Sequence, residues 1–253
     1  MRVVHAGCIG AVLWVAGAGA CGGIADGGAA GGDSTSTSSD AGQGAARREG
    51  GTANGGDGGP ISCSGGVCPS PADVSAFVAT WKPPRTIQPG ACSAALISAF
   101  YEGCIAAGGG GDCTAFGPGG DAAHQACAAC LTSPFANATW GPIVTSANIL
   151  ETNESGCIAL LDPSAIDCAK AVQALDECEH AACDPVCHAG TDATFDQWVQ
   201  CSSAANGCGC APELAATACV QGIAAGTGPA ARCLVGQTFQ DLFEVTATAF
   251  CGD

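Results

Sequence analysis

One short stretch of the chain carries most of the residue types that could do chemistry. Acids, cysteines and two histidines lie together between residues 176 and 188. His180, Asp184 and His188 are spaced four apart, so on one continuous helix they would share a face and could ligate a metal ion. Pro185 interrupts such a helix, because proline has no backbone N–H to donate. The pattern therefore favours loop residues beside disulfides, with a metal site at His180, Asp184 and His188 as the alternative.

The same stretch contains a spacing associated with haem. The run from Cys183 through Cys187 to His188 is similar to the C-x-x-C-H attachment motif of c-type cytochromes, lengthened by one residue. The extra residue departs from that motif. We therefore expect no haem and no other cofactor, and we keep a redox or metal-binding protein centred on Cys178 to His188 as the second hypothesis for function.

Two further cysteine pairs have close spacings. Cys127 and Cys130 have the C-x-x-C spacing of thiol oxidoreductases, but they fall late in a predicted helix, where the helix dipole disfavours a thiolate. Cys208 and Cys210 are separated by a single glycine. For both pairs we expect structural disulfides to other parts of the chain.

Enzyme signatures are missing from the sequence. It contains no G-x-S-x-G turn, no H-E-x-x-H helix, no phosphate-binding G-x-x-x-x-G-K-[ST] loop and no calcium-loop pattern. The net charge is −16, and residues 63–253 carry eighteen acids against four bases. Because nucleic-acid binding depends on basic surfaces, we expect no nucleic-acid partner. An extracellular enzyme of an unrecognised class stays open as a third hypothesis.

The cysteine content indicates an oxidising compartment. Of the 20 cysteines, Cys8 lies in the predicted signal peptide and Cys21 directly after it, which leaves an even set of eighteen for pairing. The candidates for disulfides are Cys63, Cys68, Cys92, Cys104, Cys113, Cys127, Cys130, Cys157, Cys168, Cys178, Cys183, Cys187, Cys201, Cys208, Cys210, Cys219, Cys233 and Cys251.

The N-terminus has the pattern of an export signal. Residues 1–20 combine Arg2, an apolar run and a small-residue end. The segment from Ala18 to Cys21 resembles the lipobox of bacterial lipoproteins, with alanine where leucine is usual at the first position, and the resemblance implies lipidation of Cys21. Ordinary signal-peptidase cleavage after Ala20 is the alternative. Residues 21–62 are rich in Gly, Ser, Ala and Asp and predict a disordered tether.

Residues 63–253 predict an all-α fold, a bundle of helices with small side chains that is stapled by disulfides. Apolar spacing and capping residues predict helices over 70–81, 92–107, 121–131, 162–179, 191–199, 212–223 and 238–250. Residues 140–150 predict a short strand or a loop. Eight cysteines lie in 63–157 and ten in 158–253, which is compatible with two subdomains that divide there.

The layout of residues 1–62 resembles that of Cys-rich surface lipoproteins of high-GC, myxobacteria-like bacteria, and residues 63–253 share their cysteine density. The resemblance implies an extracytoplasmic protein anchored to the cell envelope, in contact with the membrane only through its lipid. It implies no activity. The first hypothesis for function is therefore a non-enzymatic binding or structural module on the envelope, with an envelope or extracellular partner of unknown identity.

Overall fold

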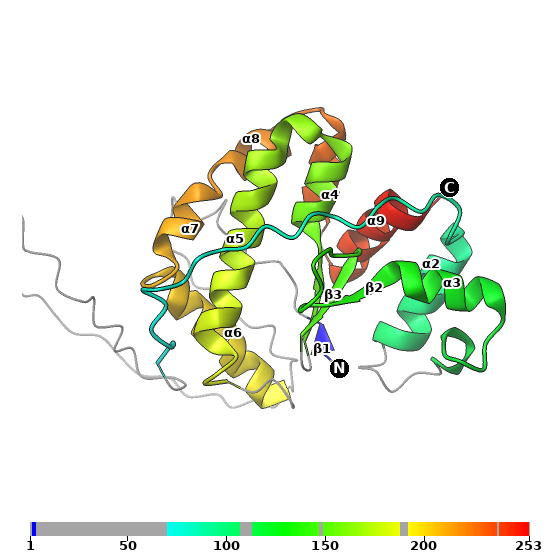
Figure 1. Ribbon diagram of the computed structural model, residues 1–253, viewed down its shortest axis with the longest axis horizontal. Helices are drawn as coiled ribbons and strands as arrows, with labels where there is room; N and C mark the ends of the chain where they lie inside the picture. The colour runs from blue at the N-terminus through cyan, green and yellow to red at the C-terminus, as the bar shows by residue number, and fades with distance from the viewer. Residues whose placement is uncertain are drawn as a thin grey trace, which may run out of the picture. The chain divides into compact units, whose positions relative to one another are not determined.

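The computed structural model describes residues 2–3, 70–106, 113–146, 149–187, 192–236 and 238–252 (Figure 1). The predicted lipidation site Cys21, the tether, Cys63, Cys68 and His188 lie outside the described residues, as does the predicted signal peptide apart from Arg2 and Val3. Most of the described chain is helical and stapled by disulfides, so the predicted fold class is confirmed. A small sheet is added to it.

The helices have the following bounds: α2 Ala94–Phe100, π-helix η1 Tyr101–Ala106, 3₁₀-helix η2 Thr114–Phe116, α3 Ala122–Leu131, α4 Glu154–Leu161, 3₁₀-helix η3 Pro163–Ala165, α5 Ile166–Cys183, α6 Asp192–Asn206, α7 Ala211–Ala216, α8 Cys219–Ala225, 3₁₀-helix η4 Pro229–Leu234 and α9 Phe239–Cys251. The strands are β1 Arg2–Val3, β2 Thr132–Pro134, β3 Ile143–Ser146 and β4 Ile149–Thr152.

Capping residues account for several of the helix starts. The side chain of Ser93 accepts from the backbone N–H of Leu96, and that of Asp121 accepts from His124 at the start of α3. Thr238 and Asp241 form a reciprocal capping box at the start of α9. These bonds satisfy N–H groups that have no partner within the helix. The predicted helix over 212–223 is divided into α7 and α8, and the sequence analysis did not predict α4.

The predicted helix over residues 70–81 is wrong, because this part of the chain is extended. Its backbone groups bond to α5: the N–H of Ala72 donates to the carbonyl of Ala182, and the N–H of Thr80 donates to the Glu177 carboxylate. Val78, one of the apolar residues whose spacing predicted the helix, is 81% exposed. Tertiary hydrogen bonds therefore replace those that a helix would make internally. In Figure 1 this extended segment crosses α5 and continues to the end of α9.

The sheet has the strand order β1-β4-β3-β2. Strand β3 pairs antiparallel with β4 and parallel with β2, and β1 pairs parallel with β4. Successive side chains of a strand point to opposite faces. On one face Ile143 and Leu150 join a core with α4, α9 and η1, whereas on the other Ile149 joins a second core with α5 and α6. The sheet therefore separates two packed layers.

Seven disulfides connect described residues. They are Cys92–Cys127, Cys104–Cys113, Cys130–Cys251, Cys157–Cys233, Cys168–Cys219, Cys178–Cys210 and Cys183–Cys201.

Their connectivity corrects one inference from the cysteine counts. The even counts in 63–157 and 158–253 would allow each segment to pair its cysteines internally, but Cys130–Cys251 and Cys157–Cys233 link the two segments. Residues 62–253 also form one compact unit by their contacts. The pairing is therefore not confined within two subdomains.

A disulfide should stabilise the protein more when it closes a longer loop, and the gain grows with the logarithm of the loop length. Cys130–Cys251 spans 121 residues, whereas Cys104–Cys113 spans 9. We expect the double substitution Cys130→Ala/Cys251→Ala to lower the free energy of unfolding by about 5 kcal/mol, and Cys104→Ala/Cys113→Ala by about 2.5 kcal/mol. Unfolding in guanidinium chloride without reductant measures both. Equal losses would contradict the loop-entropy explanation.

Candidate functional site

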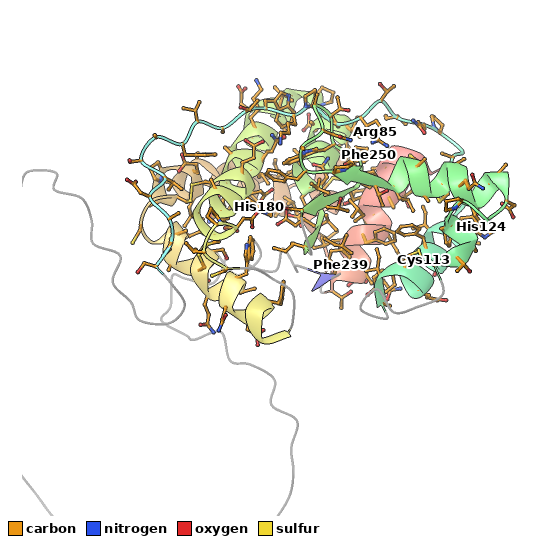
Figure 2. All side chains as sticks on the ribbon, turned by 60° about the horizontal axis from the view of Figure 1, so that its bottom comes forward. Arg85, Cys113, His124, His180, Phe239 and Phe250 are labelled. Atoms are coloured by element: carbon orange, nitrogen blue, oxygen red, sulfur yellow. A yellow bond between two sulfur atoms is a disulfide. The ribbon has the colours of Figure 1, made fainter. Side chains whose placement is uncertain are left out.

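A buried cluster of polar side chains is centred on His180. This residue lies in the last turn of α5, and its side chain is 3% exposed (Figure 2). Its Nε2 lies 2.7 Å from the Oε1 atom of Glu151 on β4, and its Nδ1 lies 2.8 Å from the Oδ2 atom of Asp184. One imidazole therefore bridges the sheet and the end of α5 with both of its nitrogens.

Aromatic side chains and further hydrogen bonds fix this arrangement. The His180 ring centroid lies 4.7 Å from that of Phe135 and 5.3 Å from that of Trp198. The indole N–H of Trp198 donates to Oδ1 of Asp184 at 2.9 Å, and the hydroxyl of Ser146 donates to Oδ2 at 3.2 Å. Elements β3, β4, α5 and α6 all contribute to the cluster.

The protonation of His180 follows from its partners. Burial alone would lower the pKa of His180, but the charge of Glu151 and the hydrogen bonds with Asp184 and Glu151 outweigh burial and hold the pKa well above its usual value. Burial would raise the pKa of Asp184. The hydrogen bond with His180 and the charge of His180 outweigh burial and bring the pKa of Asp184 below its usual value. His180 is therefore an imidazolium, and Asp184 beside it is a carboxylate.

Three more acids close to this cluster behave in the opposite way. Burial raises the pKa of Glu154 to about 8, against the hydrogen bond from Thr152. Burial also raises the pKa of Glu179 to about 7, although Asn206 donates to it, and raises that of Asp176 well above its usual value. The negative charge of Glu151 adds to all three shifts. Glu154 and Asp176 therefore keep their protons at neutral pH, whereas Glu179 is about half protonated there.

The predicted metal ligands are only partly brought together. His180 and Asp184 are in contact, and His188 lies outside the described residues. An imidazolium whose two nitrogens donate to carboxylates has no lone pair for a metal ion. Across the described part of the chain, no group of three or more His, Cys, Asp and Glu side chains is arranged to hold a metal ion.

The other cysteine motifs have structural partners. Cys127 and Cys130 bond to Cys92 and Cys251 rather than to each other. Of the pair around Gly209, Cys210 bonds to Cys178 and Cys208 is also disulfide-bonded. These four cysteines are therefore in disulfides, as the sequence analysis predicts.

One cysteine of the haem-like motif is also in a disulfide. Cys183 bonds to Cys201 on α6, so this sulfur is not free to form a thioether with a haem vinyl group. Cys178, the first residue of the stretch, is bonded to Cys210. The described part of this stretch, residues 178–187, therefore supplies two disulfide cysteines and the centre of the His180 cluster.

A cavity of about 580 Å³ lies on the other face of the sheet. It is lined by Phe100, Cys104, Ile105, Cys113, Thr132, Pro134, Ile143, Thr145 and Leu150. Cys104 and Ile105 come from the π-helix η1, a form that often marks functional sites. The sequence analysis did not predict this cavity, because its walls come from segments that only the fold brings together.

The lining is apolar and held in place. Apart from two threonine hydroxyls, the side chains are hydrocarbon rings, aliphatic groups and a disulfide. The Cys104–Cys113 bond joins two of the lining residues and fixes this wall. None of the described residues around the cavity has an ionisable group, so the cavity is suited to binding rather than to acid–base or nucleophilic chemistry.

Comparisons of the chain with protein-family models, with curated proteins and with solved structures gave no match. Within its described residues, the chain has no helix that is long and apolar enough to cross a membrane.

The raised carboxyl pKa values predict that the fold is most stable in mild acid. Folded Glu154 and Glu179 keep protons that the unfolded chain releases near pH 4.3, so the free energy of unfolding should fall from pH 5 to 8, by about 1.4 kcal/mol per pH unit for each retained proton. His180 acts in the same direction, because its raised pKa gives stability that is lost as the pH rises. The lowered pKa of Asp184 adds stability only above about pH 4 and cannot reverse this trend.

Guanidinium chloride unfolding at pH 5, 6, 7 and 8 measures the slope. The variant Glu154→Gln carries a neutral side chain at every pH, so its slope should be shallower by up to about 1.4 kcal/mol per pH unit. The matched control is Asp167→Asn on the exposed side of α5, where the carboxylate side chain is 94% exposed and the slope should not change. A stability that is constant or rises from pH 5 to 8 would contradict this account of the cluster.

Proposed function

We propose that the protein is a non-enzymatic binding module anchored to the bacterial cell envelope, and that its ligand places an apolar group in the cavity beside η1. The observation that carries the proposal is the cavity itself. Its volume of about 580 Å³ falls within the range of about 300–1,000 Å³ that is usual for small-ligand sites. Protein interiors are otherwise closely packed, so an apolar space of this size in a disulfide-stapled domain is suited to an apolar ligand.

The walls of the cavity support binding over catalysis. The hydroxyls of Thr132 and Thr145 donate to backbone carbonyls, which leaves their oxygens as acceptors for a ligand, and the rest of the lining offers dispersion contacts. The charged His180 cluster involves the opposite face of the sheet and satisfies its own hydrogen bonds. We therefore assign it to stability and the cavity to function.

The disulfides indicate an oxidising, extracytoplasmic location. The proposal adds that acylated Cys21 anchors the protein to the envelope and that residues 21–62 tether the domain. A net charge of −16 supports contact with the membrane through the lipid alone, since anionic head groups repel an acidic domain.

A neutral apolar fluorophore tests the cavity. We expect N-phenyl-1-naphthylamine to bind the purified protein with enhanced emission, and we expect Thr145→Phe to weaken binding at least tenfold by filling the space. Thr248→Phe places the same side chain on the exposed side of α9 and should leave binding unchanged. Absence of binding, or equal binding by both variants, would reject the cavity as the ligand site.

Intact mass before and after reduction with alkylation tests the anchor. We expect a chain that begins at an acylated Cys21 and whose eighteen remaining cysteines are all paired. Cleavage after Ala20 without acylation would reject the anchor and leave the cavity proposal standing. Several free thiols in the native protein would reject the fully paired framework.

A further inference from the structure

Within the part of the chain that the structure describes, two residues pair with the outer edge of strand β4. In the sheet order β1-β4-β3-β2, β4 lies between β3 and the short strand β1. Strand β1 consists of Arg2 and Val3, which pair in parallel with Ile149 and Leu150. Both belong to the segment 1–20 that the proposed processing removes. A mature chain that begins at Cys21 would therefore expose the backbone N–H and C=O groups along this edge of β4.

This edge adjoins the cavity. Leu150 on β4 and Thr145 on β3 are paired across the sheet, and both line the cavity. Residues that are paired between neighbouring strands point to the same face of a sheet. Any residue of an added strand that pairs with Leu150 would therefore direct its side chain to the cavity side of the sheet.

The geometry points to an extended peptide segment as the ligand: we propose that it adds to the sheet as a strand parallel to β4 and places one large apolar side chain in the cavity. The inference rests on the proposed function and names its ligand class. Backbone hydrogen bonds along Ile149–Thr152 would hold the segment whatever its sequence. The cavity would select the side chain that is paired with Leu150.

The direction of pairing argues against a second copy of this chain as the occupant. Two copies joined edge to edge about a two-fold axis pair the same strand antiparallel. The observed pairing on this edge of β4, with β1, is parallel. The acidic groups do not oppose a peptide on the cavity side either, because Glu151 alternates with Leu150 along the strand and bonds to His180 on the other face.

Synthetic peptides test this inference on the processed protein. The first probe is acetyl-Arg-Val-Val-His-Ala-amide, which repeats residues 2–6. A second probe carries phenylalanine in place of its first valine, the position that pairs with Leu150. We expect the phenylalanine peptide to bind at least tenfold more tightly, to displace N-phenyl-1-naphthylamine, and to slow hydrogen exchange at the backbone amides of β4. The variant Thr145→Phe should abolish the preference for phenylalanine.

Two N-methylated peptides provide the matched control. In a strand, alternate amides face the neighbouring strand. Methylation of the first valine nitrogen or of the second should therefore weaken binding in one peptide by at least tenfold and leave the other nearly unchanged. Both peptides keep the arginine charge, so attraction to the acidic domain would treat them alike.

The outcomes separate this inference from the proposed function. Equal binding of the two methylated peptides, or no protection at β4, would overturn strand addition. If the fluorophore still bound in that case, the cavity would remain a site for small apolar ligands. Loss of both fluorophore and peptide binding would reject the two proposals together. A dimer that forms through β4 without peptide would also overturn the inference.

Discussion

The charged, hydrogen-bonded cluster of His180, Glu151 and Asp184 holds the two layers of this protein in register. Glu151 belongs to the sheet, whereas His180 and Asp184 belong to the end of α5, and Trp198 from α6 bonds to the same aspartate. Removal of one partner would leave an unpaired charge largely shielded from water, which is much more costly than the loss of a neutral contact. The orientation of β4, and with it the cavity wall on its other face, depends on this cluster.

Disulfides supplement a core of modest side chains. Cysteines and alanines supply nearly half of the described buried apolar residues, beside larger groups such as Trp198, Phe239, Phe243 and Phe250. Small side chains bury little apolar area each, so packing alone contributes less free energy per residue than in an ordinary core. Cross-links compensate by limiting the unfolded chain. The segment 70–92 adds hydrogen bonds to α5 and, through Gln88 and Cys92, to residues at the end of α9.

How far the sequence predicted the structure depends on whether the signal was local. Caps at Ser93, Asp121 and Thr238 act within one helical turn, and the corresponding helices were predicted. Residues 70–81 also had a cap-like start and apolar spacing, but their backbone bonds come from α5, almost 100 positions away. The contact of His180 with Asp184 follows from a four-residue spacing, whereas Glu151 and the cavity depend on the sheet topology. The two cysteines of a disulfide are also far apart in the sequence. The sequence therefore predicted which cysteines form disulfides but not which cysteine pairs with which.

The connection between Cys130 and Cys251 has a consequence for how the protein is made. Synthesis runs from the N-terminus, so Cys92 and Cys127 are both present before the residues that follow them. Cys130 must wait for a partner 121 positions later. In the interval its thiol is exposed to neighbours such as Cys127 and Cys157, and a wrong bond must be exchanged before the correct one can form. Correct pairing of Cys130 therefore waits for Cys251 and is helped by a compartment that reshuffles disulfides as well as forming them.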